Sequence, residues 1–435
     1  MKIQFYNARI LTMEGDAPFI EGELHVDGSR ITYVGPARTD GAFVCENGVP
    51  DCACMPQRRI DCGGDLLMPG FKNAHTHSAM TFLRSYADDL PLQEWLFEKV
   101  FPYEAKLTPE DVAVLTRLAI LEYLTSGITL LSDMYFCRET VARVAVETGF
   151  RAAIMDGVNN FGGSPEGSEA EYHRINAMGP LVRCKISVHA EYTTSLPLLK
   201  EMSALAHRLK EPVYIHMNET DREVQECIER YKLRPFELMD ELGMFAYGGN
   251  GYHCVHLSEN EMEIMKRRGV YAVTCPASNL KLSSGVAPVY ELLQRGIPVA
   301  IGTDGAASNN CLDMFREMFL VTGLQKLRHG ADAVDAMEVL KMACVNGARA
   351  TGFMDCDCLA PGKQADIIRI DLQQPNMQPL HNIAKNIVYS GSKQNVRMTM
   401  IAGKILYENG TFSIGTEPEE IYRDANAVIR RMTQA

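Results

Sequence analysis

The pattern of apolar and polar positions divides the chain into three stretches. Residues 1–65 alternate short β-rich runs with turns, as in IQFYNARIL and GELHVDGSRITYVG, where Asp-Gly is a hairpin signal. From Leu66 to about Met354, short apolar runs alternate with longer amphipathic segments, which is typical of a parallel sheet with crossover helices. Short β runs return after about Asp355, in ADIIRIDL and NVRMTMIAGKILYENG. The two ends of the chain are therefore expected to pair around the middle stretch.

The middle stretch contains eight candidate strands, in chain order LLMPGF, ITLLSDM, RAAIMDGV, CKISVHA, PVYIHMN, GYHCVHL, GVYAVTC and PVAIGTD. Eight strands in roughly 290 residues suit a (β/α)8 barrel. A helix is predicted in TPEDVAVLTRLAILEYLTSG, with Thr108 as N-cap, Pro109 at the first helical position and Gly127 after the end. We predict an α/β fold: a TIM-type barrel over residues 66–355, and a small β-sandwich domain formed by residues 1–65 and 356–435, which also supply a C-terminal helix.

Residue types that bind metals or transfer protons gather at the predicted carboxyl ends of the barrel strands. His75 and His77 close the first strand, His189 the fourth, His216 the fifth with Glu219 just beyond it, His253 lies in the sixth, and Asp304 closes the eighth. Each one alone would suit a structural histidine, a helix cap or a turn aspartate. Together they indicate a site, because the loops at those strand ends build the active-site face of a barrel and because buried His and Asp need polar partners.

Three imidazoles and a carboxylate, from His75, His77, His216 and Asp304, form a nitrogen and oxygen ligand set for a borderline divalent ion. Zinc is the expected metal and iron (Fe²⁺) the alternative. A catalytic zinc ion lowers the pKa of a bound water to about 7, which favours hydrolytic chemistry. One ion is expected, because Lys185 starts its strand and does not reach the rim where it would serve a second ion.

Charge and composition narrow the class of partner. The net charge of -12 and the lack of any basic run argue against nucleic acid and against an anionic membrane surface, which leaves a small-molecule substrate. No apolar stretch approaches the ~20 residues of a membrane span, and the N-terminus lacks a signal-peptide apolar region, so a cytoplasmic protein is expected. The sequence leaves open whether the protein forms a homo-oligomer.

The thirteen cysteines, odd in number and scattered, indicate reduced thiols and not a disulfide framework. Cys45, Cys52, Cys54 and Cys62 cluster in a polar loop without the paired spacing of a zinc ribbon. Free thiols are predicted there in preference to a structural metal.

The stretches MPGFKNAHTH, IHMNET, GYHCVHLS and GTDGAASNN resemble the amidohydrolase superfamily in its mononuclear deaminase branch. CPASNLKLSSGVAPV and GTDGAASNNCLDMFREM resemble more narrowly the 5'-methylthioadenosine/S-adenosylhomocysteine deaminases, which convert the adenine ring to hypoxanthine and release ammonia. The resemblance covers nearly the whole chain. It implies a metal-dependent hydrolase that deaminates 5'-methylthioadenosine, S-adenosylhomocysteine, adenosine or another 5'-modified adenosine.

Carried over residue by residue, the resemblance implies metal ligation by the four residues above and substrate contact by Glu219. Glu104, in EWLFEKVFPYEAKL, matches a glutamate that holds the ribose hydroxyls; Trp95 is expected beside the ligand, and His189 matches a histidine that faces the substrate. The mechanistic hypothesis assigns Asp304 to deprotonate the attacking water, His253 to hold it, and Glu219 to protonate N1 of adenine while C6 is attacked.

Two departures from the family pattern bear on the substrate. The family commonly has HAPYT where this chain has HAEYT, so Glu191 brings a carboxylate near the rim. The segment NNFGGSPEGSEAEY lacks an arginine that would hold the carboxylate of a homocysteine tail. Two other functions stay open. One is deamination of a free base, a pterin or an s-triazine at the same metal site, and such a substrate would have no ribose for Glu104 to hold. The other is a non-catalytic scaffold.

Overall fold

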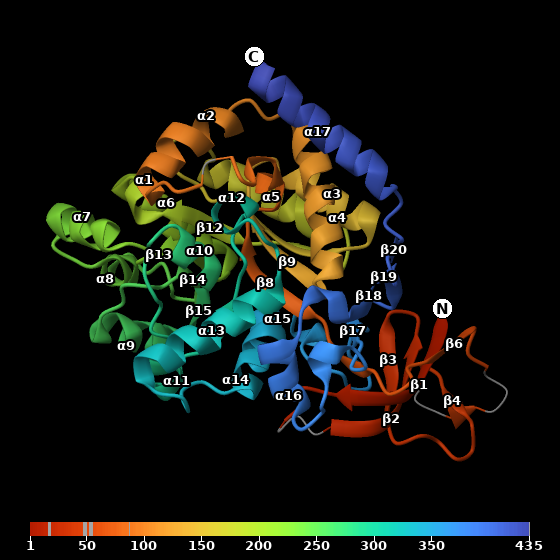
Figure 1. The fold of residues 1–435 in the computed structure, drawn as a ribbon. Helices are drawn as coiled ribbons and strands as arrows, with labels where there is room; N and C mark the ends of the chain where they lie inside the picture. The colour runs from red at the N-terminus through yellow and green to blue at the C-terminus, as the bar shows by residue number, and fades with distance from the viewer. Residues whose placement is uncertain (16–18, 47–49, 52–54, 87, 435) are drawn as a thin grey trace.

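The computed structural model describes residues 1–15, 19–46, 50–51, 55–86 and 88–434. A ring of parallel strands forms the centre of the molecule, helices surround it, and a second sheet lies to one side (Figure 1). This arrangement confirms the predicted fold class, a (β/α)8 barrel with a small β unit drawn from both chain ends.

The barrel strands form two parallel sheets that continue into each other. One sheet has the order β11-β10-β9-β8 and the other β12-β13-β14-β15-β16. The strands are β8 (Phe71–Thr76), β9 (Ile128–Met134), β10 (Arg151–Met155), β11 (Val182–Cys184), β12 (Ile186–Ala190), β13 (Val213–Met217), β14 (Gly249–His253), β15 (Val270–Thr274) and β16 (Val299–Ile301).

Two junctions close the ring. Lys185 alone separates β11 from β12, so these two strands act as one, and Lys185 N donates to Ile154 O at 2.9 Å. On the opposite side Asp304 N, just after β16, donates to His75 O in β8 at 3.0 Å. The second junction matters for function, because it ties together two of the predicted metal ligands.

The prediction that LLMPGF is the first barrel strand is wrong, because most of this segment lies in the other sheet. Leu66–Pro69 forms β7, which pairs with β1 (Lys2–Leu11) and β17 (Ile367–Ile370) in the other sheet. The barrel strand begins only at Phe71, because the chain changes sheets at Gly70. Gly70 N donates to Asp366 O at 3.1 Å, and a Cβ at Gly70 would lie 2.1 Å from the Thr129 side chain.

The second sheet joins both chain ends along one hydrogen-bonded path, β20-β19-β18-β17-β7-β1-β2-β3, with β6 also paired to β1. Its own apolar core includes Phe5, Leu24 and Met400, and is separate from the barrel core. The remaining strands are β2 (Phe19–Asp27), β3 (Arg30–Gly35), β6 (Arg58–Asp61), β18 (Val396–Ile401), β19 (Lys404–Glu408) and β20 (Thr411–Phe412), and a small separate pair is formed by β4 (Phe43–Val44) and β5 (Pro50–Asp51).

A buried ion pair fixes the barrel against this sheet. The Arg151 guanidinium of β10 donates to both carboxylate oxygens of Asp366, at 2.7 and 2.9 Å, and both side chains are almost fully enclosed. Burial acts to raise the pKa of Asp366, but Arg151 outweighs it and holds that pKa below its usual range. The two-point geometry sets the orientation of one unit on the other.

The helices follow the strands around the outside of the barrel. They are α1 (Leu92–Glu94), α2 (Phe101–Glu104), α3 (Pro109–Thr125), α4 (Arg138–Thr148), α5 (Pro165–Asn176), α6 (Leu196–Leu209), α7 (Asp221–Tyr231), α8 (Pro235–Glu241), α9 (Glu259–Arg268), α10 (Pro276–Lys281), α11 (Val289–Gln294), α12 (Ala306–Asn309), α13 (Met314–His329), α14 (Ala336–Lys341), α15 (Gly347–Ala350), α16 (Ile383–Lys385) and α17 (Pro418–Gln434).

The predicted caps of α3 are confirmed: Thr108 and Asp111 form a reciprocal capping box, and Gly127 has φ +73° beyond the end. The C-terminal helix α17 lies along α3 (Figure 1), where Arg431 pairs with Asp111. Within the described part of the chain, no helix is long and apolar enough to cross a membrane.

The prediction of free thiols in the cysteine cluster is wrong at Cys45, which is disulfide-bonded. Cys52 and Cys54 lie outside the described residues, while Cys62 is a free thiol whose burial raises its pKa to about 12. Counting Cys62, ten of the described cysteines are free thiols, as predicted, and most of them are buried.

Candidate active site

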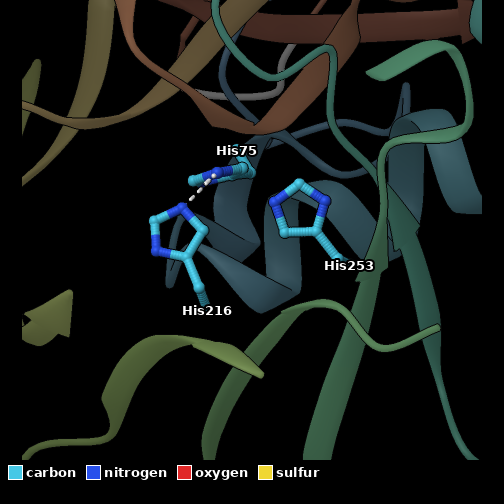
Figure 2. Close-up of side chains that lie close together, drawn as sticks. All are labelled: His75, His216 and His253. Atoms are coloured by element: carbon cyan, nitrogen blue, oxygen red, sulfur yellow. Dashed lines mark hydrogen bonds between the residues drawn. The ribbon is translucent and has the colours of Figure 1, made fainter. Parts of the chain in front are cut away.

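Five of the predicted residues meet at the carboxyl ends of four barrel strands. His75 lies near the end of β8 with His77 just past it, His216 lies in β13, His253 ends β14, and Asp304 follows β16. The imidazoles of His75, His216 and His253 turn toward one another (Figure 2). His75 also stacks on Tyr252 in the barrel interior, with ring centroids 3.8 Å apart, so the site rests on the packed core.

Several pairs of donor atoms in this cluster are spaced as two ligands of one metal ion would be. His75 Nε2 lies 3.1 Å from His216 Nε2 and 3.5 Å from Asp304 Oδ1, and His77 Nε2 lies 3.2 Å from Asp304 Oδ1. Two ligand atoms that are each about 2.1 Å from one ion, at angles of about 90 to 110°, are about 3.0 to 3.4 Å apart. His75, His77 and Asp304 form one group whose donor atoms all lie within 4.8 Å of one another, and His75, His216 and His253 form another, so His75 is common to both groups.

Backbone carbonyls set the tautomer of two of these histidines. His77 Nδ1 donates to Met134 O at 2.5 Å, and His216 Nδ1 donates to His189 O at 2.6 Å. Each ring then directs its Nε2 toward the centre of the site. Such outer hydrogen bonds orient histidine ligands and raise their basicity, as in other metal sites.

The charges of the ligand set follow from burial and from Asp304. Burial lowers the pKa of His75 to about 3 and that of His216 well below its usual value, so both rings are neutral. Burial acts in the same direction on His77, but its contact with Asp304 raises the pKa to about 9. Burial opposes ionisation of Asp304, yet the two histidines hold its pKa well below the usual range.

Two hydroxyls fix the carboxylate of Asp304. Ser278 Oγ and Ser308 Oγ each donate to Oδ2 at 2.6 Å, which leaves Oδ1 facing His75 and His77. The backbone of Asp304 is left-handed, with φ +58°, a conformation that non-glycine residues adopt at a cost. The surrounding hydrogen bonds therefore hold a specific orientation of this carboxylate.

Glu219 follows β13 and lies beside His253, with 3.8 Å between Glu219 Oε2 and His253 Nε2. The carboxylate of Glu223 accepts the backbone N–H of Glu219 at 2.8 Å and that of Asn218 at 3.0 Å, which fixes the turn. Burial raises the pKa of Glu219, so its carboxylic acid form persists to higher pH than in water. His253 Nδ1 donates to Asn279 Oδ1 at 2.8 Å.

A cavity of about 740 Å³ opens above these residues. Of the nine predicted site residues, only His75 does not line it, because that ring lies beneath the others; the lining residues are Trp95, Glu104, His77, His189, His216, Glu219, His253 and Asp304. Three of the four candidate metal ligands, the candidate acid and the candidate substrate contacts thus share one space. Burial lowers the pKa of His189 to about 4, and its Nδ1 lies 2.9 Å from the Thr193 hydroxyl.

Glu104 reaches the cavity from the end of α2. Its enclosed Oε1 and the nearby Tyr135 hydroxyl have no hydrogen bond of ordinary geometry in the described part of the chain, although the two groups lie close enough for each to shift the pKa of the other. Burial raises the pKa of both groups, and the Glu104 carboxylate raises that of Tyr135 further. Buried acceptors are normally satisfied, so this carboxylate is available to a ligand.

The sequence analysis missed a group of cavity residues after β9 and β10. Tyr135 and Arg138 follow the predicted strand ITLLSDM, and Asp156 follows the next strand. A search of strand ends for every polar type, and not for metal ligands alone, would have found them. Arg138, from α4, does line the cavity, but it is paired there with Asp156 and Glu171.

The expectation that Glu191 brings a carboxylate to the rim is wrong. Glu191 is 1% exposed, does not line the cavity, and pairs with Arg230 of α7 at 2.7 Å. The arginine neutralises the carboxylate behind the strand end, so Glu191 is part of the packing between β12 and α7.

Comparisons with known proteins agree with this geometry. The model of the amidohydrolase family matches residues 66–406. A 5-methylthioadenosine/S-adenosylhomocysteine deaminase of Desulfitobacterium hafniense (strain Y51) is 40% identical over 409 residues, 92% of each chain. The crystal structure of an adenosine deaminase from Xanthomonas campestris with bound zinc has a TM-score of 0.91 at 33% identity, and the match covers 100% of this chain and 99% of that one.

A more distant structure shares the fold alone. Atrazine chlorohydrolase from Arthrobacter aurescens TC1, complexed with zinc, has a TM-score of 0.86 over 98% of this chain and all of its own, at 20% identity.

Proposed function

The chain belongs to the amidohydrolase family and, within it, to the 5-methylthioadenosine/S-adenosylhomocysteine deaminases, and from this membership we propose that it hydrolytically deaminates adenosine-type nucleosides. The products are the inosine analogue and ammonia, so the enzyme is a hydrolase of C–N bonds in cyclic amidines. The observation that supports this most strongly is that one cavity is lined by His77, His216, Asp304, Glu219 and Glu104, with His75 directly beneath it.

We infer one zinc ion, held by His75, His77, His216 and Asp304. His75 lies within ligand spacing of both His216 and Asp304, the nitrogen and oxygen donors suit zinc, and the similar Xanthomonas campestris structure carries zinc. Bound there, a divalent ion lowers the pKa of a water and so supplies hydroxide at neutral pH. Iron remains the alternative that metal analysis of the purified protein decides.

Proton movements are assigned to residues that face the same space. Asp304, whose carboxylate Ser278 and Ser308 hold through Oδ2, accepts a proton from the attacking water. Glu219, whose pKa is raised by burial, protonates N1 of the adenine ring. His253 holds the water through Nε2, because its Nδ1 is already bonded to Asn279. The proton held by Asp304 then passes to the C6 amino group, which leaves as ammonia, while the C6 hydroxyl returns a proton to Glu219 and becomes the carbonyl of the inosine product.

Binding is assigned to the cavity wall. A carboxylate accepts two hydrogen bonds from a vicinal diol, and Glu104 has a free oxygen for this purpose. Trp95, which is 5% exposed, and His189 line the same wall and pack against the nucleoside. Ribose binding by Glu104 favours nucleosides over free bases.

The test is ammonia release by metal-loaded protein from adenosine, methylthioadenosine, S-adenosylhomocysteine, guanine and an s-triazine. We expect the nucleosides to react and the free ring compounds to fail. Reaction of guanine or the triazine alone would keep the metal chemistry and refute the substrate class. No ammonia from any compound, with metal bound, would support the scaffold alternative.

Glu104→Gln makes the same test residue-specific. We expect kcat/KM for adenosine to fall roughly 10- to 100-fold, since a hydrogen-bonded charge is lost, and kcat/KM for 2',3'-dideoxyadenosine to change little. Glu98→Gln is the matched control, because Glu98 is exposed in the same segment and does not line the cavity.

A further inference from the structure

One wall of the cavity carries a charged cluster that the deamination chemistry does not use. The Arg138 cluster consists of Arg138 from α4, Asp156 after β10 and Glu171 from α5, and all three side chains line the cavity. Arg138 Nη1 lies 2.7 Å from Asp156 Oδ2, and its Nη2 contacts Glu171. The Arg138 side chain is 7% exposed, so it belongs to the wall and not to the outer surface.

The β9–α4 connection places this cluster relative to the metal ligands. Met134 at its start accepts the hydrogen bond from His77, Tyr135 comes next and lies close to Glu104, and Arg138 stands at its end. The wall thus leads from the metal ligands past the ribose contact to the Arg138 cluster. The placement of the substrate rests on the proposed function. If the adenine ring lies at the metal ligands and the ribose diol at Glu104, the 5' carbon of the ribose points toward the Arg138 cluster.

The cluster has an excess of negative charge. One guanidinium is shared between two carboxylates, which leaves a formal charge of about -1. Asp156 is held in place, because its Oδ1 accepts from Ser187 at 2.7 Å and its Oδ2 from Ser168 at 2.5 Å. Burial raises the pKa of Glu171 and Arg138 opposes that shift. Asp156 and Glu171 already neutralise the Arg138 cation. An anionic ligand would therefore gain little attraction from Arg138 and would be repelled by the two carboxylates.

We propose that Asp156 and Glu171 select the charge of the 5' substituent, so that this cavity accepts adenosines with a neutral or cationic 5' group and excludes those with an anionic one. Charges that line a cleft with low-dielectric walls act on a ligand more strongly than they would in water. S-adenosylhomocysteine carries both an ammonium and a carboxylate on its tail, so substrates with a single charge are needed to separate the two effects.

The wild-type enzyme provides the first test, with adenosine-5'-carboxylate, the isosteric adenosine-5'-carboxamide and 5'-amino-5'-deoxyadenosine. We expect kcat/KM to be at least about tenfold lower for the carboxylate than for the carboxamide, and the amine to match or exceed the carboxamide. Equal turnover of the carboxylate and the carboxamide would overturn the proposal. This comparison needs no variant.

Glu171→Gln assigns the selectivity to the cluster. Removing one negative charge should raise the ratio of carboxylate to amine turnover about tenfold. Glu139→Gln is the matched control, because Glu139 is the neighbour of Arg138 on α4 but pairs with Arg174 at the surface and does not line the cavity. An equal shift in both variants would indicate a general charge effect and contradict the proposal.

The outcomes separate this inference from the proposed function. If adenosine and the carboxamide release ammonia but charge has no effect, the charge selection alone fails. If no adenosine derivative releases ammonia, the proposed function fails.

Discussion

At the residue scale, Glu219 combines a fixed position with a raised pKa. Its backbone is tied to Glu223, its Oε1 lies 3.3 Å from the Ser284 hydroxyl, and its Oε2 faces His253. None of these contacts is a ligand bond in the proposed metal set. A substitution at Glu219 can therefore remove the proposed proton donor and leave the proposed metal ligands in place.

Glu219→Gln should lower kcat by about 10² to 10⁴-fold, because the amide keeps the shape but cannot deliver a proton to N1. Metal content, measured by elemental analysis, should stay at the wild-type level. Glu229→Gln, an exposed position on the neighbouring helix α7, is the control and should retain full activity. Retained activity in the Glu219 variant would remove this residue from the proton-donor role.

The sequence predicted these site residues because strand ends in a barrel share one face. That rule needs no knowledge of side-chain orientation, and it brought His189, His253 and Glu219 to one cavity. It could not separate Glu191 from them, since only the packed structure reveals Arg230 beneath the strand end. It also passed over Arg138, whose position depends on the path of the loop after β9.

At the element scale, the close contact of β16 with β8 carries the ligand set. A Cβ at Gly302 would lie 2.8 Å from both Cβ and the carbonyl oxygen of His75, so no larger residue fits between the strands. The neighbouring Asp304 N donates to that carbonyl. The spacing of these two strands therefore sets the distance between two proposed ligands.

Gly302→Ala should push β8 and β16 apart, cost about 1 to 3 kcal/mol of stability through overpacking, and weaken metal binding. Thermal unfolding and metal titration measure the two effects. Gly323→Ala on the outer face of α13 is the control, since a Cβ there meets nothing within 4 Å and alanine favours the helix. Unchanged metal affinity in the Gly302 variant would show that the strand spacing does not control the site.

Periodicity and turn chemistry predicted most elements but not where the chain changes sheets. The capped helix α3 agrees with its prediction, because the cap and its following glycine are local signals. LLMPGF looked like one apolar strand, yet its two halves lie in different sheets. The split between the two sheets follows from the pairing of β7 with β17. Roughly 300 residues of chain separate these two strands, so no local sequence signal could reveal their pairing.

At the scale of the whole molecule, the second sheet joins the two chain ends and the barrel carries the site. β7 leads directly through Gly70 into β8, which holds His75, so the same segment connects the sheet to the proposed metal ligands. The Arg151–Asp366 pair joins the barrel to the second sheet. Neither residue lines the cavity, because the pair lies on the other side of the barrel. The sequence indicated that the ends pair, but gave no register for them.

The most direct test of the account is ammonia release from methylthioadenosine by the same protein before metal removal, after removal with a chelator, and after zinc is restored. We predict that release is lost with the metal and returns with about one zinc ion per chain. Ammonia release that persists in fully metal-free protein, or none from the zinc-loaded protein, would contradict the assignment.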